Sequence, residues 1–202
     1  MIDNKLNLKD HIKHVHSKIS KAIFSINQMK HILDQKHLKL LAGAYIRSHI
    51  EYCCNIFTLC YDSTLKPLEV IYKRMIRTIT GKPRFTHTPP LFFQEEILPL
   101  KSLIEFRVAK FTHQALNNNK FPFYGLWKKN REREGYNLRD LDNIYLQDFR
   151  LHMFKMHPYF SFPRIWNNID NELKNVQDHT EFCIELKQHL LDKLVMPAPA
   201  GI

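Results

Sequence analysis

Glycine is scarce in this sequence, which has only five glycines among 202 residues. Loops that cradle a phosphate through backbone amides need several glycines close together, and five leave little material for such a loop. No serine or cysteine is flanked by the glycines of a nucleophile elbow, so this local signature of a hydrolase is missing as well. The scarcity of glycine therefore argues against a glycine-rich nucleotide site and against this class of enzyme.

The sequence also has few cysteines and no long apolar run. Its four cysteines include the neighbours Cys53 and Cys54, which are a poor disulfide pair, so we expect all four thiols to be reduced. No stretch approaches the roughly 18 to 20 apolar residues that cross a bilayer. Residues 1–30 are polar and rich in lysine and histidine, unlike a signal peptide. We therefore expect a cytoplasmic or nuclear protein with no membrane partner.

Three groups of polar residues have the chemistry of metal ligands, but none has the spacing of a complete site. His11, His14 and His16 are explained as polar side chains on a solvent-exposed helix face. His49, Cys53, Cys54 and Cys60 are explained as buried side chains whose thiols behave as small apolar groups. Asp140 and Asp142 are explained as part of a loop of mixed charge. We predict no metal, no cofactor, no catalytic residue and no small-molecule substrate, and no pattern indicates the oligomeric state.

Acidic residues are scarce in the first part of the chain. Residues 1–84 contain 15 Lys/Arg against 6 Asp/Glu, a net charge of +9, whereas residues 85–202 contain 15 against 14, a net charge of +1. A local excess of positive charge favours a polyanionic partner, and nucleic acid is the commonest polyanion inside a cell. An anionic membrane surface is the alternative, although it requires exposed aromatic residues on an amphipathic helix.

The basic residues concentrate around one amphipathic helix, predicted over residues 63–80 between the capping side chains of Asp62 or Ser63 and the terminating Gly81. Its cations Lys66, Lys73, Arg74 and Arg77 fall on one side of the helix, and its apolar residues fall in one sector on the opposite side. These apolar residues are Leu65, Leu68, Ile71, Tyr72, Met75, Ile76 and Ile79. Residues 73–84 contain five Lys/Arg and no acid. Solvation and phosphate binding both explain such a face, and the absence of acids favours phosphate binding. The predicted nucleic-acid contacts are Lys66, Lys73, Arg74, Arg77, Lys82 and Arg84.

Apolar residues that recur every three or four positions predict further helices and a mainly α fold. We expect a helical bundle over residues 1–124, a polar linker at residues 125–143, and a small α/β or α appendage at residues 144–202. The helices of the bundle are predicted over residues 8–33, 35–52, 63–80 and 100–117.

The connections between these helices are predicted from turn and capping residues. Asp34 is expected to cap the second helix. Residues 52–61 are continuously apolar and aromatic, so the pattern does not separate helix from strand. Pro83, Pro89 and Pro90 predict an extended loop after the basic helix.

The appendage has weaker signals. Alternating apolar and polar residues predict a short strand around residues 144–156. Pro158 and Pro163 are expected to bound an aromatic turn, and Thr180 is expected to cap a last helix.

The first part of the chain resembles the C-terminal region of reverse transcriptases from non-LTR (LINE-type) retrotransposons. The segment NLKDHIKHVHSKISKAIFSINQMKHIL is similar to the family's helix that opens with Trp-Lys-X-His-Ile, although the Trp is absent. The segment KHLKLLAGAYIRSHIEYC is similar to a Leu-rich helix that ends in Leu-X-Tyr-Cys. The matching residues are Leu8, Lys9, His11, Ile12, Ile50, Tyr52 and Cys53.

The resemblance continues to about residue 194. LKPLEVIYKRMIRTITG is similar to the family's Leu-X-X-Leu-Gln-Arg-X-Leu-Arg-X-Ile-X-Gly-like run, with Tyr72 in place of the usual Gln. HTPPLFFQEEILPL is similar to His-Thr-X-Pro-Leu-Phe followed by Ile-Leu. PRIWNNIDNELKN is similar to a Gly-Pro-X-Leu-Trp-Asn segment, with Phe162 in place of the Gly and Asp170 near a usual Pro. The residues that match in the first of these runs are Leu65, Leu68, Arg74, Arg77, Ile79 and Gly81.

The resemblance implies a thumb-like helical region followed by an appendage, which in such enzymes grip the template–primer duplex beside the active site. The sequence has no fingers, no palm and no Tyr-X-Asp-Asp motif, so we expect no two-metal centre for RNA-directed DNA polymerisation. The substituted tryptophan and glycine positions indicate a degenerate or repurposed copy.

Three hypotheses remain open. The favoured one is a non-catalytic, sequence-tolerant nucleic-acid-binding module. The second is a folded or protein-interaction fragment of the same ancestry that does not bind nucleic acid. The third is a truncated piece of an active reverse transcriptase.

Overall fold

The computed structural model describes residues 8–132, 141–146 and 156–195. Within these residues the chain is mainly α-helical, as predicted, and has no strand beyond an isolated antiparallel bridge between Lys129 and Ile144. None of the described helices is long and apolar enough to cross a membrane. The elements are α1 (Lys9–Met29), α2 (Gln35–Ala42), η1 (Gly43–Arg47), α3 (Ser48–Glu51), η2 (Cys54–Leu59), α4 (Asp62–Ile79), α5 (Pro89–Gln94), α6 (Leu100–Asn117), η3 (Asn130–Glu132), α7 (Pro158–Asn167), α8 (Asn171–Lys174) and α9 (His179–Asp192).

The chain divides into two compact units. Unit 1 comprises Met1–Leu103 and Leu190–Ile202, and unit 2 comprises Ile104–His189. The predicted linker at residues 125–143 lies inside unit 2, because Trp127 is buried and packs against Phe111 and Phe162. Residues 133–140 of that linker lie outside the described part of the chain.

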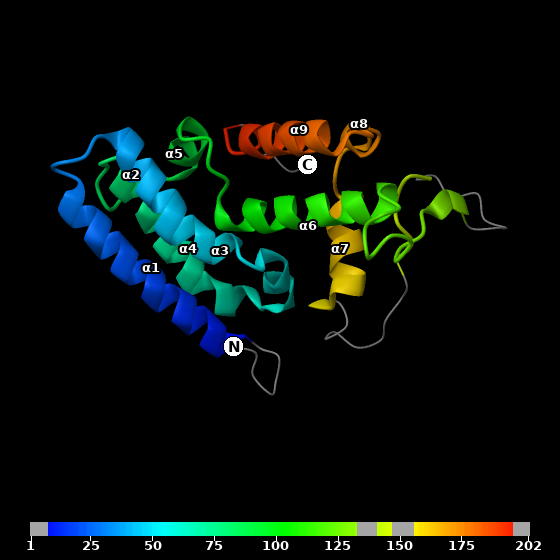
Figure 1. The fold of residues 1–202 in the computed structure, drawn as a ribbon, viewed down its shortest axis with the longest axis horizontal. Helices are drawn as coiled ribbons and strands as arrows, with labels where there is room; N and C mark the ends of the chain where they lie inside the picture. The colour runs from blue at the N-terminus through cyan, green and yellow to red at the C-terminus, as the bar shows by residue number, and fades with distance from the viewer. Residues whose placement is uncertain (1–7, 133–140, 147–155, 196–202) are drawn as a thin grey trace, which may run out of the picture. The chain divides into compact units, whose positions relative to one another are not determined.

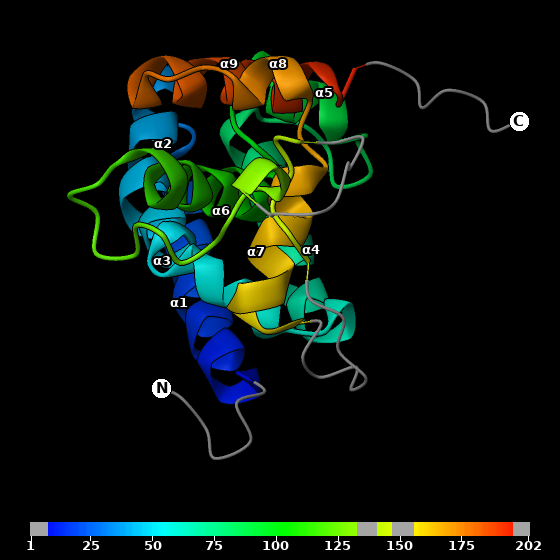
Figure 2. The same cartoon turned by 90° about the vertical axis from the view of Figure 1, so that its right-hand side faces the viewer.

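Unit 1 is built around α1 and α4, which run beside each other, with α2 and α3 packed on α1 (Figure 1). The rotated view shows α1 next to α3 again (Figure 2). Each buried aliphatic side chain stabilises the unit by about 1.5–3 kcal/mol, so the two apolar faces hold the helices together. The buried residues of these faces are Ile12, Val15, Ile19, Ile23 and Ile26 in α1, and Leu65, Leu68, Ile71, Tyr72, Met75, Ile76 and Ile79 in α4.

The helix predicted over residues 35–52 is present but interrupted. The Asp34 carboxylate accepts a hydrogen bond from the His37 amide at 2.9 Å, which caps α2 as predicted. The middle turn, η1, is a π-helix, and α3 follows it directly. A π turn adds one residue to the helical repeat, which period-based reasoning does not detect.

The segment that the pattern left ambiguous, residues 52–61, contains the 3₁₀ helix η2. Cys54 and Phe57 are the buried residues of this helix. Its preceding residue, Cys53, has a left-handed φ of 52°, which turns the chain from α3 into η2.

The extended loop predicted through Pro89 and Pro90 is wrong at these two residues, because both belong to the first turn of α5. Amides in the first turn of a helix have no partner within the helix, so proline is tolerated there. The helix buries Leu91 and Phe92.

In unit 2, the aromatic turn predicted between Pro158 and Pro163 is instead the helix α7, which contains both prolines. Pro163 has no amide hydrogen to donate to the carbonyl of Tyr159, four residues earlier. The indole Nε1 of Trp127 donates to that carbonyl at 3.3 Å. A tertiary contact thus supplies the hydrogen bond that the proline cannot make.

The predicted last helix is α9, but Thr180 lies within its first turn and does not precede it. The Asp178 carboxylate accepts a hydrogen bond from the Thr180 amide at 3.1 Å. The predicted strand around residues 144–156 falls largely on residues 147–155, which lie outside the described residues. Ile144 itself forms only the isolated bridge with Lys129.

Candidate nucleic-acid interface

The basic face of α4 ends in a tight reversal at Gly81. Gly81 has a φ of +65°, as predicted for the residue after a helix, and the Lys82 amide donates to the Arg77 carbonyl at 2.9 Å. Glycine adopts this left-handed conformation without the steric cost that a Cβ brings. The reversal places Lys82 next to the last turn of α4.

The segment after Gly81 is fixed to α4 by a second contact. The Thr86 amide donates to the Pro83 carbonyl at 3.1 Å, which closes a four-residue turn. The Thr86 carbonyl accepts a hydrogen bond from Nε of Arg77 at 2.9 Å. Arg77 therefore holds the turn through Nε, and its other guanidinium donors form no hydrogen bond with another described residue.

A groove with a volume of about 600 Å³ lies between the C-terminal end of α1, the second half of α4 and the segment after Gly81. It brings together four of the six predicted contacts, Arg74, Arg77, Lys82 and Arg84, and adds Lys30 from the end of α1. The residues that line it are Asn27, Lys30, Val70, Arg74, Arg77, Thr78, Gly81, Lys82 and Arg84.

The groove carries positive charge that nearby carboxylates do not neutralise. No acidic residue lines it, and none of its five cations forms an ion pair with another described residue. The C-terminal ends of α1 and α4 contribute about half a negative charge each through their dipoles. The five positive side chains exceed the negative charge of the two helix ends by about four charges. Stabilisation of the helix ends therefore does not explain why all five cations are in the groove.

The other two predicted contacts, Lys66 and Lys73, do not line the groove. Their ammonium groups lie 3.5 Å and 2.6 Å from the carboxylate of Glu69. The hydrogen bond from Lys73, together with the charges of Lys73 and Lys66, lowers the pKa of Glu69 below its ordinary value. These two lysines therefore share one acid, and their role in binding remains a prediction.

Sequence reasoning missed the part of the groove that comes from α1. Asn27 and Lys30 lie more than forty positions before Arg74, and the only signal for their approach is that α1 and α4 both need a partner for an apolar face. It also missed Phe85, which follows Arg84 and is 92% exposed.

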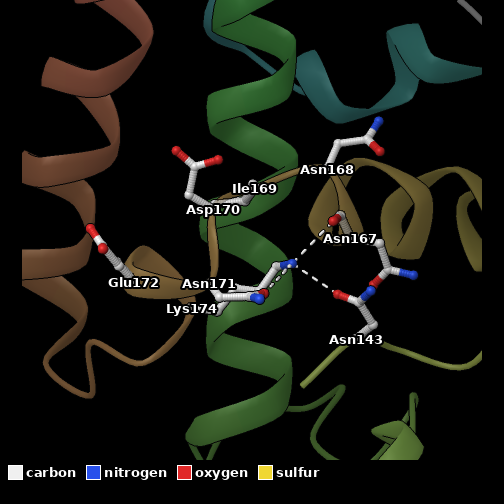
Figure 3. A pocket seen from close by; sticks show the side chains of 8 residues that line it. All are labelled: Asn143, Asn167, Asn168, Ile169, Asp170, Asn171, Glu172 and Lys174. Carbon is white, nitrogen blue, oxygen red and sulfur yellow. Dashed lines mark hydrogen bonds between the residues drawn. The ribbon is translucent and has the colours of Figure 1, made fainter. Parts of the chain in front are cut away.

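Unit 2 contains a polar pocket of about 560 Å³ around Lys174 (Figure 3). Lys174 is only 3% exposed, and its ammonium group donates to the Asn143 side chain at 2.8 Å, the Asn167 carbonyl at 3.0 Å and the Asn171 side chain at 3.3 Å. An ammonium group has three hydrogens. Since the protein accepts all three, Lys174 organises the local structure and has no donor left for a ligand.

A chain of histidines and a cysteine joins α6 to α9 within unit 2. Nε2 of His113 lies 2.9 Å from the Val176 carbonyl, Nδ1 of His113 lies 3.2 Å from Nδ1 of His179, and Nε2 of His179 lies 3.7 Å from Sγ of Cys183. A carbonyl only accepts, so His113 donates from Nε2. When both imidazoles are neutral, Nδ1 of His113 accepts from Nδ1 of His179, and Nε2 of His179 accepts from the thiol.

The same chain does not have the charge state of a nucleophile pair. Burial lowers the pKa of His113 and of His179 and raises the pKa of Cys183. Nucleophilic cysteines need a thiolate, which a neighbouring imidazolium stabilises. Burial here favours the neutral thiol and the neutral imidazole.

The other cysteines and histidines form no metal site in the part of the chain that the structure describes. No group of three or more His, Cys, Asp or Glu side chains is arranged to hold a metal ion among these residues. Burial raises the pKa of Cys60 to about 11, which favours the neutral thiol. Asp142, from the predicted linker, forms an ion pair with Arg131.

Comparison with known proteins adds no relative on which to base a function. No family model, no curated protein and no solved structure matches the chain. The functional conclusion therefore rests on the groove, the charge distribution and the ordered motifs described above.

Proposed function

We propose that the chain is a non-catalytic, sequence-tolerant nucleic-acid-binding module, and that Lys30, Arg74, Arg77, Lys82 and Arg84 bind phosphate groups in the groove of unit 1. The observation that carries this proposal is a groove lined by five cations and no acid. Arginine supports it further, because a planar guanidinium offers paired donors to the oxygens of a phosphate.

The number of cations in the groove sets the expected salt dependence. Each phosphate contact releases about 0.7 counterions from a single strand and about 0.9 from a duplex. With four to five contacts, the affinity should fall by about 50- to 500-fold between 50 and 200 mM salt. The side chains of the groove contain no motif that reads base edges, so we expect weak sequence preference.

The ancestry that we propose is the C-terminal part of a LINE-type reverse transcriptase. Five motifs in the family's order support it, and the run LKPLEVIYKRMIRTITG, from Leu65 to Gly81, is among them. The role that follows is binding of a duplex or an RNA–DNA hybrid without nucleotide addition, in the cytoplasm or nucleus.

Charge reversal in the groove tests the proposal. In the double variant Arg74→Glu, Lys82→Glu, two contacts are replaced by repulsive charges. The affinity for a labelled strand of about 20 nucleotides, alone or paired as an RNA–DNA hybrid, should therefore fall at least about tenfold at about 100 mM salt, and the salt slope should flatten. The measurement is fluorescence anisotropy on the full chain across a salt series.

A matched control separates the effect of the groove on affinity from the effect of the net charge. Lys18 on α1 and Lys36 on α2 are exposed and do not line the groove. The variant Lys18→Glu, Lys36→Glu has the same net charge as the groove variant but should retain most of the affinity. Equal losses in the two variants, or wild-type binding that ignores salt, would contradict the proposal and favour the fragment without nucleic-acid binding.

A further inference from the structure

Phe85 is an exposed aromatic residue that does not pack in the core of unit 1. It is 92% exposed, the highest value among the exposed large apolar side chains of the described residues. It packs on no aromatic ring of the described residues, and its ring contact is with the Arg84 guanidinium, 5.9 Å from the ring centroid. Phe85 therefore adds little to the stability of unit 1.

The position of Phe85 is nevertheless fixed. It is the third residue of the turn that the Thr86 amide closes on the Pro83 carbonyl at 3.1 Å. Nε of Arg77 holds the Thr86 carbonyl at 2.9 Å, and Thr88, two residues later, is buried. Because the backbone on both sides is anchored, a partner that binds the ring does not have to order this loop first.

The neighbours of Phe85 are the phosphate-binding residues proposed above. Arg84 lines the groove, and its guanidinium group lies over the Phe85 ring. Lys82 belongs to the same segment, and Arg77 holds that segment through the Thr86 carbonyl. An exposed aromatic face beside a basic groove is the arrangement with which proteins bind single strands, since bases stack on the ring while cations follow the backbone.

We propose that Phe85 is a stacking platform for an unpaired base, so that the preferred ligand of the groove is a strand with at least one exposed base. This inference rests on the proposed function and adds to it the class of nucleic acid. Fully paired duplex offers a base face only at its ends, so we expect a single strand or a duplex with a single-stranded overhang to bind more tightly than a blunt duplex.

An abasic strand separates stacking from phosphate binding. We would compare an oligothymidylate of about 20 nucleotides with an abasic strand of equal length and charge, against the full-length wild type and Phe85→Ala. Stacking of one base corresponds to about a 5- to 150-fold effect on the dissociation constant. Phe85→Ala should therefore weaken oligothymidylate binding about fivefold or more and leave abasic binding within about twofold.

A tryptophan at the same position gives a direct signal. Phe85→Trp should keep the affinity for oligothymidylate, and its fluorescence should be quenched by this strand but not by the abasic one. The natural tryptophans, Trp127 and Trp166, are buried in unit 2 and provide a constant background. Tyr52→Ala, which removes an exposed aromatic side chain outside the groove, is the control and should not change either affinity.

The outcomes of this experiment separate a failure of the stacking inference from a failure of the proposed function. If the abasic strand binds with a normal salt slope and Phe85→Ala has no selective effect, the stacking inference is wrong while the proposed function stands. If neither strand binds the wild type, the stacking inference is wrong, and if an RNA–DNA hybrid of the same length also fails to bind, the proposed function is wrong as well. If vesicles containing phosphatidylserine shift the emission of the Phe85→Trp variant to the blue while oligothymidylate leaves it unchanged, the ring inserts into a membrane surface and the inference is overturned.

Discussion

Glu69 decides how many cations of α4 are available to a ligand. Its carboxylate lies 2.6 Å from Lys73 and 3.5 Å from Lys66. Glu69 is partly buried, with 20% of its side chain exposed, while Lys66 and Lys73 are 66% and 38% exposed. Exposed ion pairs contribute at most about 1 kcal/mol to stability. Lys66, the more exposed of the two lysines, can therefore exchange this partner for a phosphate at a small cost.

Replacing Glu69 by glutamine should strengthen nucleic-acid binding. The substitution removes one negative charge and frees two lysines, so the salt slope should rise by up to about 1.4 to 1.8 and the affinity at 50 mM salt by several-fold. The measurement is the same anisotropy titration across salt. Asp10→Asn is the control, because Asp10 pairs with Lys13 on α1 and its loss changes the net charge equally. Identical behaviour of the two variants would show that Glu69 has no local effect on binding.

At the scale of the element, the geometry of the groove depends on how α4 ends. Gly81 has a φ of +65° and nothing lies within 4 Å of a Cβ added there, so the cost of a side chain is conformational and not steric. Gly43, in η1, has a φ of −58° and equally open surroundings. The two glycines thus form a natural pair for comparison.

Gly81→Ala should destabilise unit 1 by about 1 kcal/mol, since alanine pays for the left-handed conformation. Gly43→Ala should be neutral or stabilising by up to about 1 kcal/mol, because alanine suits a helical φ and reduces the freedom of the unfolded chain. Urea unfolding followed by circular dichroism measures both. The Gly81 variant should also bind nucleic acid more weakly, as Lys82 loses its fixed position. A Gly81→Ala variant as stable as Gly43→Ala would contradict this account of the helix end.

The elements also show which features of the fold are predictable from sequence. The apolar period predicts α4 and all seven of its buried residues, because a helix that buries one face needs that period. The π turn in η1 and the helices α5 and α7 do not follow from period or proline rules. In α7 the compensation for Pro163 is a hydrogen bond from Trp127, which is distant in sequence.

The candidate site likewise has a part that the sequence predicts and a part that depends on tertiary packing. Arg74, Arg77, Lys82 and Arg84 are predictable because they share one helix and the segment after it. Lys30 is not, because its approach depends on how α1 packs against α4, and neither is the pairing of two lysines with Glu69.

At the scale of the whole molecule, the two units carry different reporters. The proposed groove belongs to unit 1, whereas both tryptophans, Trp127 and Trp166, belong to unit 2 and are buried there. Tryptophan fluorescence therefore follows the unfolding of unit 2, and circular dichroism follows the helices of both units.

Unit 2 should lose stability in acid because of His113 and His179. Burial is the main cause that lowers the pKa of both imidazoles in the folded chain. The charge of Lys129 lowers the pKa of His113 further, and those of His113 and Lys110 lower the pKa of His179, whereas Asp178 raises both and the Val176 carbonyl raises that of His113. Below about pH 6.5, the ordinary pKa of histidine, the unfolded chain therefore binds protons that the folded chain does not. The stability is fully present above that pH and falls as the pH drops toward the folded values.

Urea unfolding at pH 7, 6 and 5 tests this reasoning. The midpoint detected by tryptophan fluorescence should fall steadily between pH 7 and pH 5. His113→Phe keeps a ring that can stack on Phe182, with which His113 is stacked at 4.3 Å, but cannot be protonated. This variant should therefore have a smaller pH dependence even if its midpoint at pH 7 is lower. His14→Gln, at an exposed position of α1, should leave the fluorescence-detected dependence unchanged. An equal slope in wild type and His113→Phe would mean that other groups set the acid response, and the neutral His113–His179–Cys183 chain would lose its role in the stability of unit 2.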